Sequence, residues 1–259
     1  MKETKKETKR ETKKAACAFS YDAIKKDEEI NLLIERGNQV LGELGFTEHS
    51  IKHAAKVAQE AARILNELGY SAHEIELSRI AGYMHDIGNS INRNDHAHTG
   101  GIMAYQILKE RKMPLSDAIL VATAIGQHDE ATGTAVDAVS AALILADKTD
   151  VRRNRVRNQV IANFDSHDRV NYAALGSHLE IKKEKKVIQM ELEMDDTMCT
   201  VMDYVGRIVE GNRLLKCKQK GEYYEKEINS NDTGGSDGSH RTVYRNDTGK
   251  GKCSGVGSM

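Results

Sequence analysis

The sequence predicts a mostly α-helical protein, in which a helical bundle is followed by a small C-terminal β-hairpin plus helix and both termini are disordered. Apolar residues recur at spacings of three and four through five central segments, which is the pattern of helices that bury one face. One later stretch alternates apolar and polar residues around a charged turn, as strands of a hairpin do. Both ends of the chain are almost devoid of apolar side chains, so they have nothing to bury.

The N-terminal segment, residues 1–16, is predicted to be a disordered basic arm. Residues 2–13 repeat the unit Lys-Glu-Thr-Lys, with Arg replacing the first Lys in the third copy. Such a segment has no apolar group with which to form a core. RNA or an acidic lipid is an alternative partner for the arm, but glutamates interrupt its positive charge and no aromatic residue accompanies it.

Two well-marked helices come first in the central region. Apolar residues repeat from Ser50 to about Leu68 and stop at Gly69, a residue type that commonly ends helices. The pattern Ser71-Ala72-His73-Glu74 is a capping box, and the helix that it opens should run to about Gly88. His53 therefore lies inside the first helix, and the pair His85-Asp86 falls in the last turn of the second.

The remaining elements follow from the same rules, with the single proline, Pro114, placed just ahead of a helix. Three further helices are expected at roughly Thr99–Lys112, Ser116–Ile125 and Val136–Lys148. The predicted hairpin pairs His178–Lys182 with Val187–Glu193 around the turn Lys183–Lys186, and a final amphipathic helix is expected near Thr197–Leu215. The predicted domains are a helical metal-binding domain over 17–175, an appendage of hairpin and helix over 176–228, and a disordered Gly/Ser/Asn tail over 229–259.

Composition excludes several kinds of partner. The 38 basic and 39 acidic residues give a formal net charge of -1, so no overall field attracts a polyanion and nucleic acid is not expected as a partner. Four widely spaced cysteines suit a reducing compartment better than a disulfide framework. No apolar run approaches the roughly 20 residues needed to cross a bilayer, so we expect a cytoplasmic protein without a membrane partner.

The most informative residues are histidines and aspartates that fall in or beside apolar helices. They are His53, His85, Asp86, His96, His98, His128 and Asp147. Such side chains are costly to bury unless something pairs with them, and a metal ion is a common partner of this mixture. Taken singly, His53 would more often be a hydrogen-bonded core residue, and His96 and His128 would often be simply exposed. The other histidines, His49, His73, His167, His178 and His240, lie off the pattern and are expected at the surface.

In this order and spacing, the residues resemble the HD-domain metal-dependent phosphohydrolases of the stand-alone bacterial and archaeal type. That family is defined by a His, then a His-Asp pair, then an Asp on successive helices. The matching positions are His53, His85-Asp86 and Asp147, and the resemblance extends from about Asn31 to Asn158. It implies an HD-type helical bundle that binds metal through His53, His85, Asp86 and Asp147.

The resemblance also implies a second metal position, because many such proteins place two more histidines between the pair and the last aspartate. His96 and His128 fit these places, with Asp86 bridging both ions and His98 as the alternative to His96. One or two divalent ions are expected, and imidazole with carboxylate suits Mn, Fe, Co, Ni or Zn. The sequence leaves open which metal binds and how many ions there are.

The implied activity is hydrolysis of a phosphoester or phosphoanhydride of a nucleotide or related small metabolite by hydroxide that the metal activates. Asp86 and Lys148 are the predicted catalytic residues. Cations must also hold the phosphate, and the candidates are Lys148, Arg93, Arg152 and Arg155. The arginines between 152 and 157 fit a solvated, ion-paired helix face equally well.

Two functions from other classes remain open. A non-catalytic HD module could bind a nucleotide and signal, and it would differ from an enzyme by binding without turnover. An RNA-binding helper that uses the N-terminal arm and the Arg cluster is the weakest alternative. A homodimer is one option for the oligomeric state.

Overall fold

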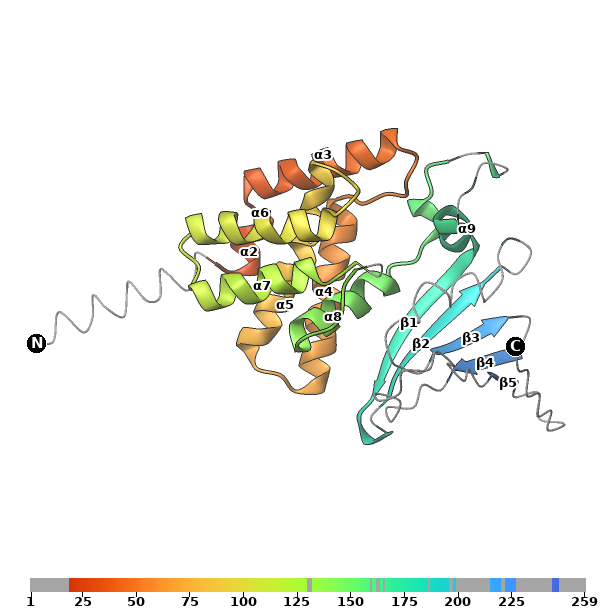
Figure 1. Cartoon of the computed structure of the whole chain (residues 1–259). Helices are drawn as coiled ribbons and strands as arrows, with labels where there is room; N and C mark the ends of the chain where they lie inside the picture. The colour runs from red at the N-terminus through yellow and green to blue at the C-terminus, as the bar shows by residue number, and fades with distance from the viewer. Residues whose placement is uncertain are drawn as a thin grey trace, which may run out of the picture.

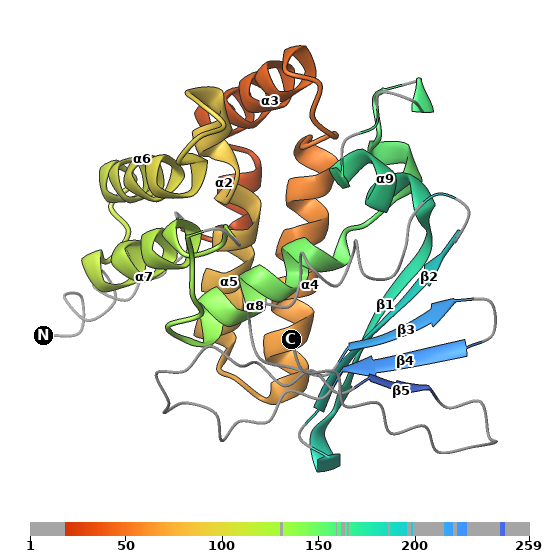
Figure 2. The same cartoon turned by 45° about the vertical axis from the view of Figure 1, so that its right-hand side comes forward.

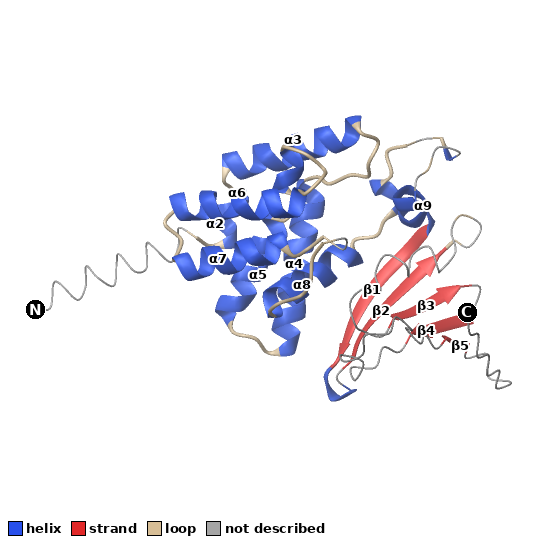
Figure 3. Ribbon diagram, in the orientation of Figure 1, coloured by secondary structure: helices blue, strands red, loops and turns tan. Residues whose placement is uncertain are grey.

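The computed structural model describes residues 19–129, 132–158, 160–161, 164, 166–185, 187–195, 198, 215–219, 222–226 and 244–246. A helical bundle is followed by a sheet that begins where the last helix ends (Figures 1 and 3). The helices are α2 (Tyr21–Lys25), α3 (Glu28–Glu43), α4 (Ile51–Leu68), α5 (Ala72–Met84), α6 (His96–Glu110), α7 (Leu115–Gly126), α8 (Ala138–Thr149) and α9 (Ser166–Ala173). Short 3-10 helices are η1 (Ile87–Ser90), η2 (Arg153–Arg155) and η4 (Lys183–Lys185), and the strands are β1 (Ala174–Lys182), β2 (Val187–Met194), β3 (Leu215–Gln219), β4 (Glu222–Lys226) and β5 (Tyr244–Asn246). The prediction of a mostly α-helical fold with a C-terminal hairpin is confirmed.

The caps that predicted α4 and α5 are present. The Ser50 side chain accepts a hydrogen bond from the backbone N–H of Lys52, and Gly69 ends α4 in the left-handed conformation at φ 84°. Ser71 and Glu74 form the predicted capping box at the start of α5. α5 ends at Met84, so the pair His85-Asp86 lies just beyond its last residue and not in its last turn. The reason is that the chain tightens there into η1, whose first bond runs from Asn89 N to Asp86 O.

The next three helices were predicted with shifted ends. α6 begins at His96, three residues before the predicted start. The prediction missed this start because the residue before it, Asp95, has a left-handed conformation and forms no side-chain cap. α7 follows Pro114 directly. α8 begins after Asp137, whose capping box with Ser140 the sequence analysis did not use.

The helices α2, α3 and α9 were not predicted. α3 has a side-chain cap, since Asp27 accepts a hydrogen bond from Ile30 N, but two glycines inside it weaken the helical pattern. One of them, Gly37, is needed for packing. A Cβ atom there would lie 3.2 Å from Asn89 Cβ and 3.2 Å from Ser90 N, so α3 can approach η1 only through a glycine.

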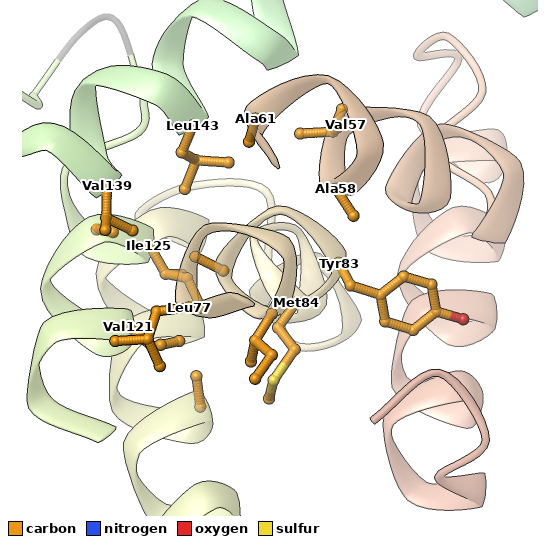
Figure 4. Close-up of a cluster of buried hydrophobic side chains, with 14 of the residues drawn as sticks. Val57, Ala58, Ala61, Leu77, Tyr83, Met84, Val121, Ile125, Val139 and Leu143 are labelled. Atoms are coloured by element: carbon orange, nitrogen blue, oxygen red, sulfur yellow. The ribbon is translucent and has the colours of Figure 1, made fainter. Parts of the chain in front are cut away.

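The hydrophobic core joins α4, α5, α7 and α8. Figure 4 shows Leu77 and Met84 of α5 in one cluster with Ala58 of α4, Val121 of α7 and Leu143 of α8. The face of α4 is rich in alanine, which lets neighbouring helices approach closely. Burial of this face is the main force that holds α4 and α8, and therefore their polar residues, in place.

The hairpin lies beside α4 and α8 (Figure 2). The predicted hairpin is present: β1 and β2 pair antiparallel from Ala174↔Met194 to Lys182↔Val187, and η4 forms the turn. β1 begins at Ala174, four residues before the predicted start at His178. Leu179 of β1 is buried in the core cluster, and Arg63 Nη2 of α4 donates a hydrogen bond to its carbonyl at 2.8 Å. The hairpin is thus attached to the bundle by both apolar and polar contacts.

The sheet continues beyond the hairpin with β3 parallel to β2 and β4 and β5 antiparallel. The predicted helix near Thr197–Leu215 lies outside the described residues, apart from Met198 and Leu215, the first residue of β3. The predicted arm 1–16 lies outside them as well, and so does the tail 229–259 except for β5. No helix in the described ranges has the length and apolar character that crossing a membrane requires.

Candidate metal centre

The bundle brings six of the predicted metal-binding residues to one place. They come from α4, from the junction of α5 and η1, from the start of α6, from the second residue after α7 and from the last turn of α8. In chain order they are His53, His85, Asp86, His96, His128 and Asp147. The first five are buried, with exposed fractions between 1% and 6%. Residues separated by almost a hundred positions in the chain therefore share one interior site.

Four atoms form what we call the first cluster, namely Nε2 of His53, Nε2 of His85, Oδ2 of Asp86 and Oδ1 of Asp147. The His53 nitrogen lies 3.3 Å from that of His85, 3.3 Å from Asp147 Oδ1 and 3.6 Å from Asp86 Oδ2. The His85 nitrogen lies 3.2 Å from Asp86 Oδ2 and 3.7 Å from Asp147 Oδ1. A tetrahedral ion with ligands at about 2.1 Å separates its donor atoms by about 3.4 Å. These distances match that requirement.

A second cluster uses the other oxygen of Asp86. Nε2 of His96 and Nε2 of His128 are 3.2 Å apart, and Asp86 Oδ1 lies 3.7 Å from the former and 3.9 Å from the latter. Asp86 therefore presents one oxygen to each cluster. This is the arrangement expected of a carboxylate that bridges two ions.

The hydrogen bonds of the four rings orient them toward the clusters. Each Nδ1 atom lies within 3.1 Å of an oxygen that can only accept: Asp150 Oδ2 for His53, Gly82 O for His85, Arg93 O for His96 and Ile125 O for His128. Each Nδ1 must therefore carry the hydrogen, and each neutral ring presents its Nε2 lone pair to the shared centre.

The charges at the centre are those that a cation needs. Burial alone would raise the pKa of Asp86, but the neighbouring His85 and His49 hold it well below its usual range. Asp147 also has a pKa well below its usual range, because Lys148, His53 and His85 outweigh its burial. Burial, together with the nearby His85 and His96, lowers the pKa of His128 to about 3. Ionised carboxylates and the neutral imidazole of His128 therefore share this centre.

His85 behaves differently from the other rings. Burial would lower its pKa, but the Asp86 and Asp147 carboxylates raise the pKa of His85 to about 10. Two buried carboxylates thus require positive charge between them. A divalent cation would provide that charge and free the His85 lone pair.

The residues present fit a metal ion. Asp86 is buried, with only 6% of its surface exposed, and its Oδ2 has no hydrogen-bond partner among the described residues. A buried carboxylate oxygen without a partner is costly, and a metal ion would satisfy it. The donor set of imidazole nitrogens and carboxylate oxygens suits a divalent transition metal better than Mg²⁺ or Ca²⁺.

Comparison with known proteins agrees with this geometry. A family model described as the HD domain matches residues 50–170, a span that contains all six residues of the two clusters. The chain is an HD-domain protein. An uncharacterized protein of Methanocaldococcus jannaschii is 27% identical over 199 residues, covering 66% of this chain and 74% of the relative. The crystal structure of a predicted HD superfamily hydrolase from an uncultured Thermotogales bacterium has a TM-score of 0.38 and 24% identity, covering 48% of this chain and 67% of that one.

Two of the four predicted phosphate-binding cations lie at the edge of the two clusters, which together we call the HD centre. Lys148 Nζ is 3.2 Å from Asp147 Oδ2, and its side chain is 19% exposed. Arg93 Nη1 is 3.1 Å from Nε2 of His96, and the guanidinium also lies over the ring of Phe46. Both cations are half-buried, and each borders a different cluster.

The other two predicted cations have different contacts. Arg152 donates through Nε and Nη2 to the two carboxylate oxygens of Asp150 at 2.7 and 2.9 Å. Arg155 is 6% exposed, and it donates to the backbone carbonyls of Asp150 and Glu48 at 2.7 and 2.9 Å. The helical spacing assumed for them does not exist, because α8 ends at Thr149 and only the short η2 follows. These contacts support a structural role for Arg155 and not phosphate binding.

The structure also distinguishes the two histidines between which the sequence could not decide. His96 contributes to the second cluster, whereas the His98 side chain is 51% exposed and lies near Asp95 at 3.4 Å. The difference follows from the helix, since residues two apart on α6 point to different sides.

Three residues of the HD centre were missed by the sequence analysis. Asn89 donates to Asp86 Oδ1 at 2.7 Å and orients the bridging carboxylate. His49, expected at the surface, instead packs its ring against His53. Asp150, the third, is 1% exposed and accepts from His53, Arg152 and Lys56. Its only sequence signal was its position one helical turn after Asp147.

Replacing Asp150 with asparagine should weaken metal binding by about 10- to 100-fold, as loss of a carboxylate behind a ligating histidine does. The variant Asp150→Asn keeps the shape but removes the charge that holds the His53 ring. Titration of the metal-free protein against a chelating dye measures the affinity. Lys56→Ala is the control, because Lys56 also binds Asp150 but is half exposed, and its affinity should stay within about threefold of the original. Equal affinities of all three proteins would contradict the role of Asp150.

Proposed function

We propose that this HD-domain protein is a metal-dependent phosphohydrolase that cleaves a phosphoester or phosphoanhydride of a nucleotide or a related small phosphorylated metabolite. The observation that supports this most strongly is the division of Asp86 between two clusters, because two adjacent cations suit phosphoryl transfer to water. When bound, such cations supply activated water at neutral pH and offset the charge of the phosphoryl oxygens.

The protein's own side chains would do the remaining work. Lys148 and Arg93, each beside a different cluster, would bind the non-bridging phosphate oxygens and orient the scissile bond. Asp86, held by Asn89, and the histidines, held by their Nδ1 bonds, form a rigid surround that needs no rearrangement when the substrate arrives. No nucleophilic side chain is required by this scheme.

Elemental analysis and a substrate panel test the proposal together. Protein supplied with Mn²⁺, Fe²⁺, Co²⁺ or Ni²⁺ should retain close to two ions per chain after gel filtration. It should also release phosphate or a nucleoside monophosphate from some member of a panel of nucleotides, dinucleoside polyphosphates and sugar phosphates. Tight nucleotide binding without any product over hours would support instead a non-catalytic signalling module. One ion per chain would restrict the site to the first cluster.

Replacement of Lys148 should slow the reaction without removing metal. Lys148→Gln removes the cation nearest to the first cluster, and we expect kcat/KM to fall by about 100-fold, a loss typical of one donor to a phosphoryl or oxyanion group. Metal content is measured in parallel and should stay unchanged, since Lys148 contacts the outer oxygen of Asp147, Oδ2. Lys109→Gln, in the last turn of α6, serves as a surface control. A variant Lys148→Gln with full activity would remove Lys148 from the mechanism.

A further inference from the structure

The loop before α4 is held firmly against the metal centre. Glu48 is bound in both directions by Arg155, since its N–H donates to Arg155 O at 2.7 Å and its carbonyl accepts from Arg155 Nε at 2.9 Å. The next residue, His49, donates its backbone N–H to Asn38 Oδ1 at 3.0 Å. Contacts with Arg155 of η2 and Asn38 of α3 thus fix the loop that leads into the first turn of α4.

This loop places the His49 ring beside the first cluster. Its ring meets that of His53 edge to face, with centroids 5.4 Å apart and an angle of 75° between the planes. Its Nδ1 lies 2.8 Å from the carbonyl oxygen of Thr47, which can only accept, so Nδ1 carries the hydrogen. In the neutral ring Nε2 is therefore the nitrogen with the free lone pair.

His49 is half-buried, and its Nε2 has no hydrogen-bond partner among the residues that the structure describes. The other four imidazoles of the centre direct the same nitrogen into a cluster. The nitrogen of His49 is thus an acceptor on a ring that packs against His53, a residue of the first cluster, and backbone hydrogen bonds hold the loop that carries this ring. Phosphate oxygens are themselves acceptors at neutral pH and are complementary to Lys148 and Arg93, not to this nitrogen.

We infer that His49 is a substrate-contacting residue whose Nε2 accepts a hydrogen bond from a hydroxyl on the carbon skeleton next to the phosphate. This rests on the proposed function and narrows its substrate class to sugar phosphates and ribonucleotides, as opposed to phosphates of unsubstituted alkyl groups. The sugar is the part of a nucleotide nearest its phosphate, so a ribosyl hydroxyl is the donor that this position suits.

A set of three phosphonates tests the inference without requiring turnover, because their carbon–phosphorus bond is not a phosphoester. Calorimetry on the full, metal-loaded chain compares ethylphosphonate with 2-hydroxyethylphosphonate and 3-hydroxypropylphosphonate. At least one hydroxylated compound should bind about three- to tenfold more tightly than ethylphosphonate, the gain of one net hydrogen bond. Equal binding of all three would overturn the inference and leave the phosphohydrolase proposal intact. If none of them binds, the inference is likewise overturned, while the substrate panel still decides the phosphohydrolase proposal.

Two variants assign the preference to His49. His49→Phe keeps an aromatic ring against His53 but removes Nε2, so the preference should fall to about one while metal content and Tm stay close to those of the original. His49→Gln supplies an amide oxygen that can accept, and it should retain part of the preference. His73→Phe changes a histidine whose side chain is 63% exposed, on α5, and should leave the preference unchanged. A preference that survives in His49→Phe would contradict the assignment.

Discussion

Asp86→Ala should remove both metal sites at once and lower hydrolysis by at least about 1000-fold. Each of the two oxygens of this carboxylate belongs to a different cluster, at 3.2 Å from His85 Nε2 and 3.7 Å from His96 Nε2. Loss of a bridging ligand therefore removes a donor from both ions, whereas loss of His53 or His128 affects only one. The expected metal content is below one ion per chain after gel filtration, against about two in the unchanged protein.

The control for Asp86→Ala is Asp95→Asn, because asparagine tolerates the left-handed conformation of this residue. Asp95 is close in sequence, but its side chain is 75% exposed and no cluster includes it. Its replacement should leave metal content and kcat/KM within about twofold of the original. His128→Ala completes the series and should bind about one ion, because only the second cluster loses a donor. Full activity in Asp86→Ala would falsify the metal assignment.

The positions of α4 and α5 could be predicted because the signals at their ends are local, and the order of the ligands could be predicted because it resembles that of a known family. Ser50, Gly69 and the Ser71–Glu74 box mark helix ends through bonds within a few residues. The sequence His53, His85-Asp86, Asp147 could be recognised because each residue interrupts an apolar helix pattern. Such interruptions are costly, so they indicate function.

The supporting residues could not be predicted because their roles depend on contacts between distant segments. Asp150 accepts from His53, 97 positions away, and Arg155 bonds the carbonyl of Glu48, 107 positions away. In the sequence both belong to a run of charges that resembles a solvated helix face. The end of α8 at Thr149 breaks the helical spacing and turns this run back toward α4. The tertiary fold alone determines which of these charges is buried.

The second large effect should come from a glycine that carries no chemistry. Gly88 is the second residue of η1, two residues after Asp86. A Cβ atom at Gly88 would collide with the carbonyl oxygen of His96 and approach Gly100 N to 2.6 Å. Both obstacles are backbone atoms, so no flexible side chain can move aside. Gly88→Ala should therefore destabilise the fold by about 2–4 kcal/mol, as overpacking of a tight contact does. The Tm measured by calorimetry should fall by about 5–15 °C.

Gly126→Ala separates this packing effect from the general cost or benefit of replacing glycine. Gly126 is the last residue of α7, and a Cβ atom there would meet nothing within 4 Å, so its replacement should leave the Tm unchanged or raise it slightly. Because the atoms that obstruct Gly88 belong to His96 and Gly100 at the start of α6, relief of the clash must displace His96. Gly88→Ala should consequently lose the ion of the second cluster before that of the first, which contains no residue of α6. An undisturbed Tm together with two bound ions would show that η1 and α6 do not pack as closely as described, and that the second cluster does not depend on this glycine.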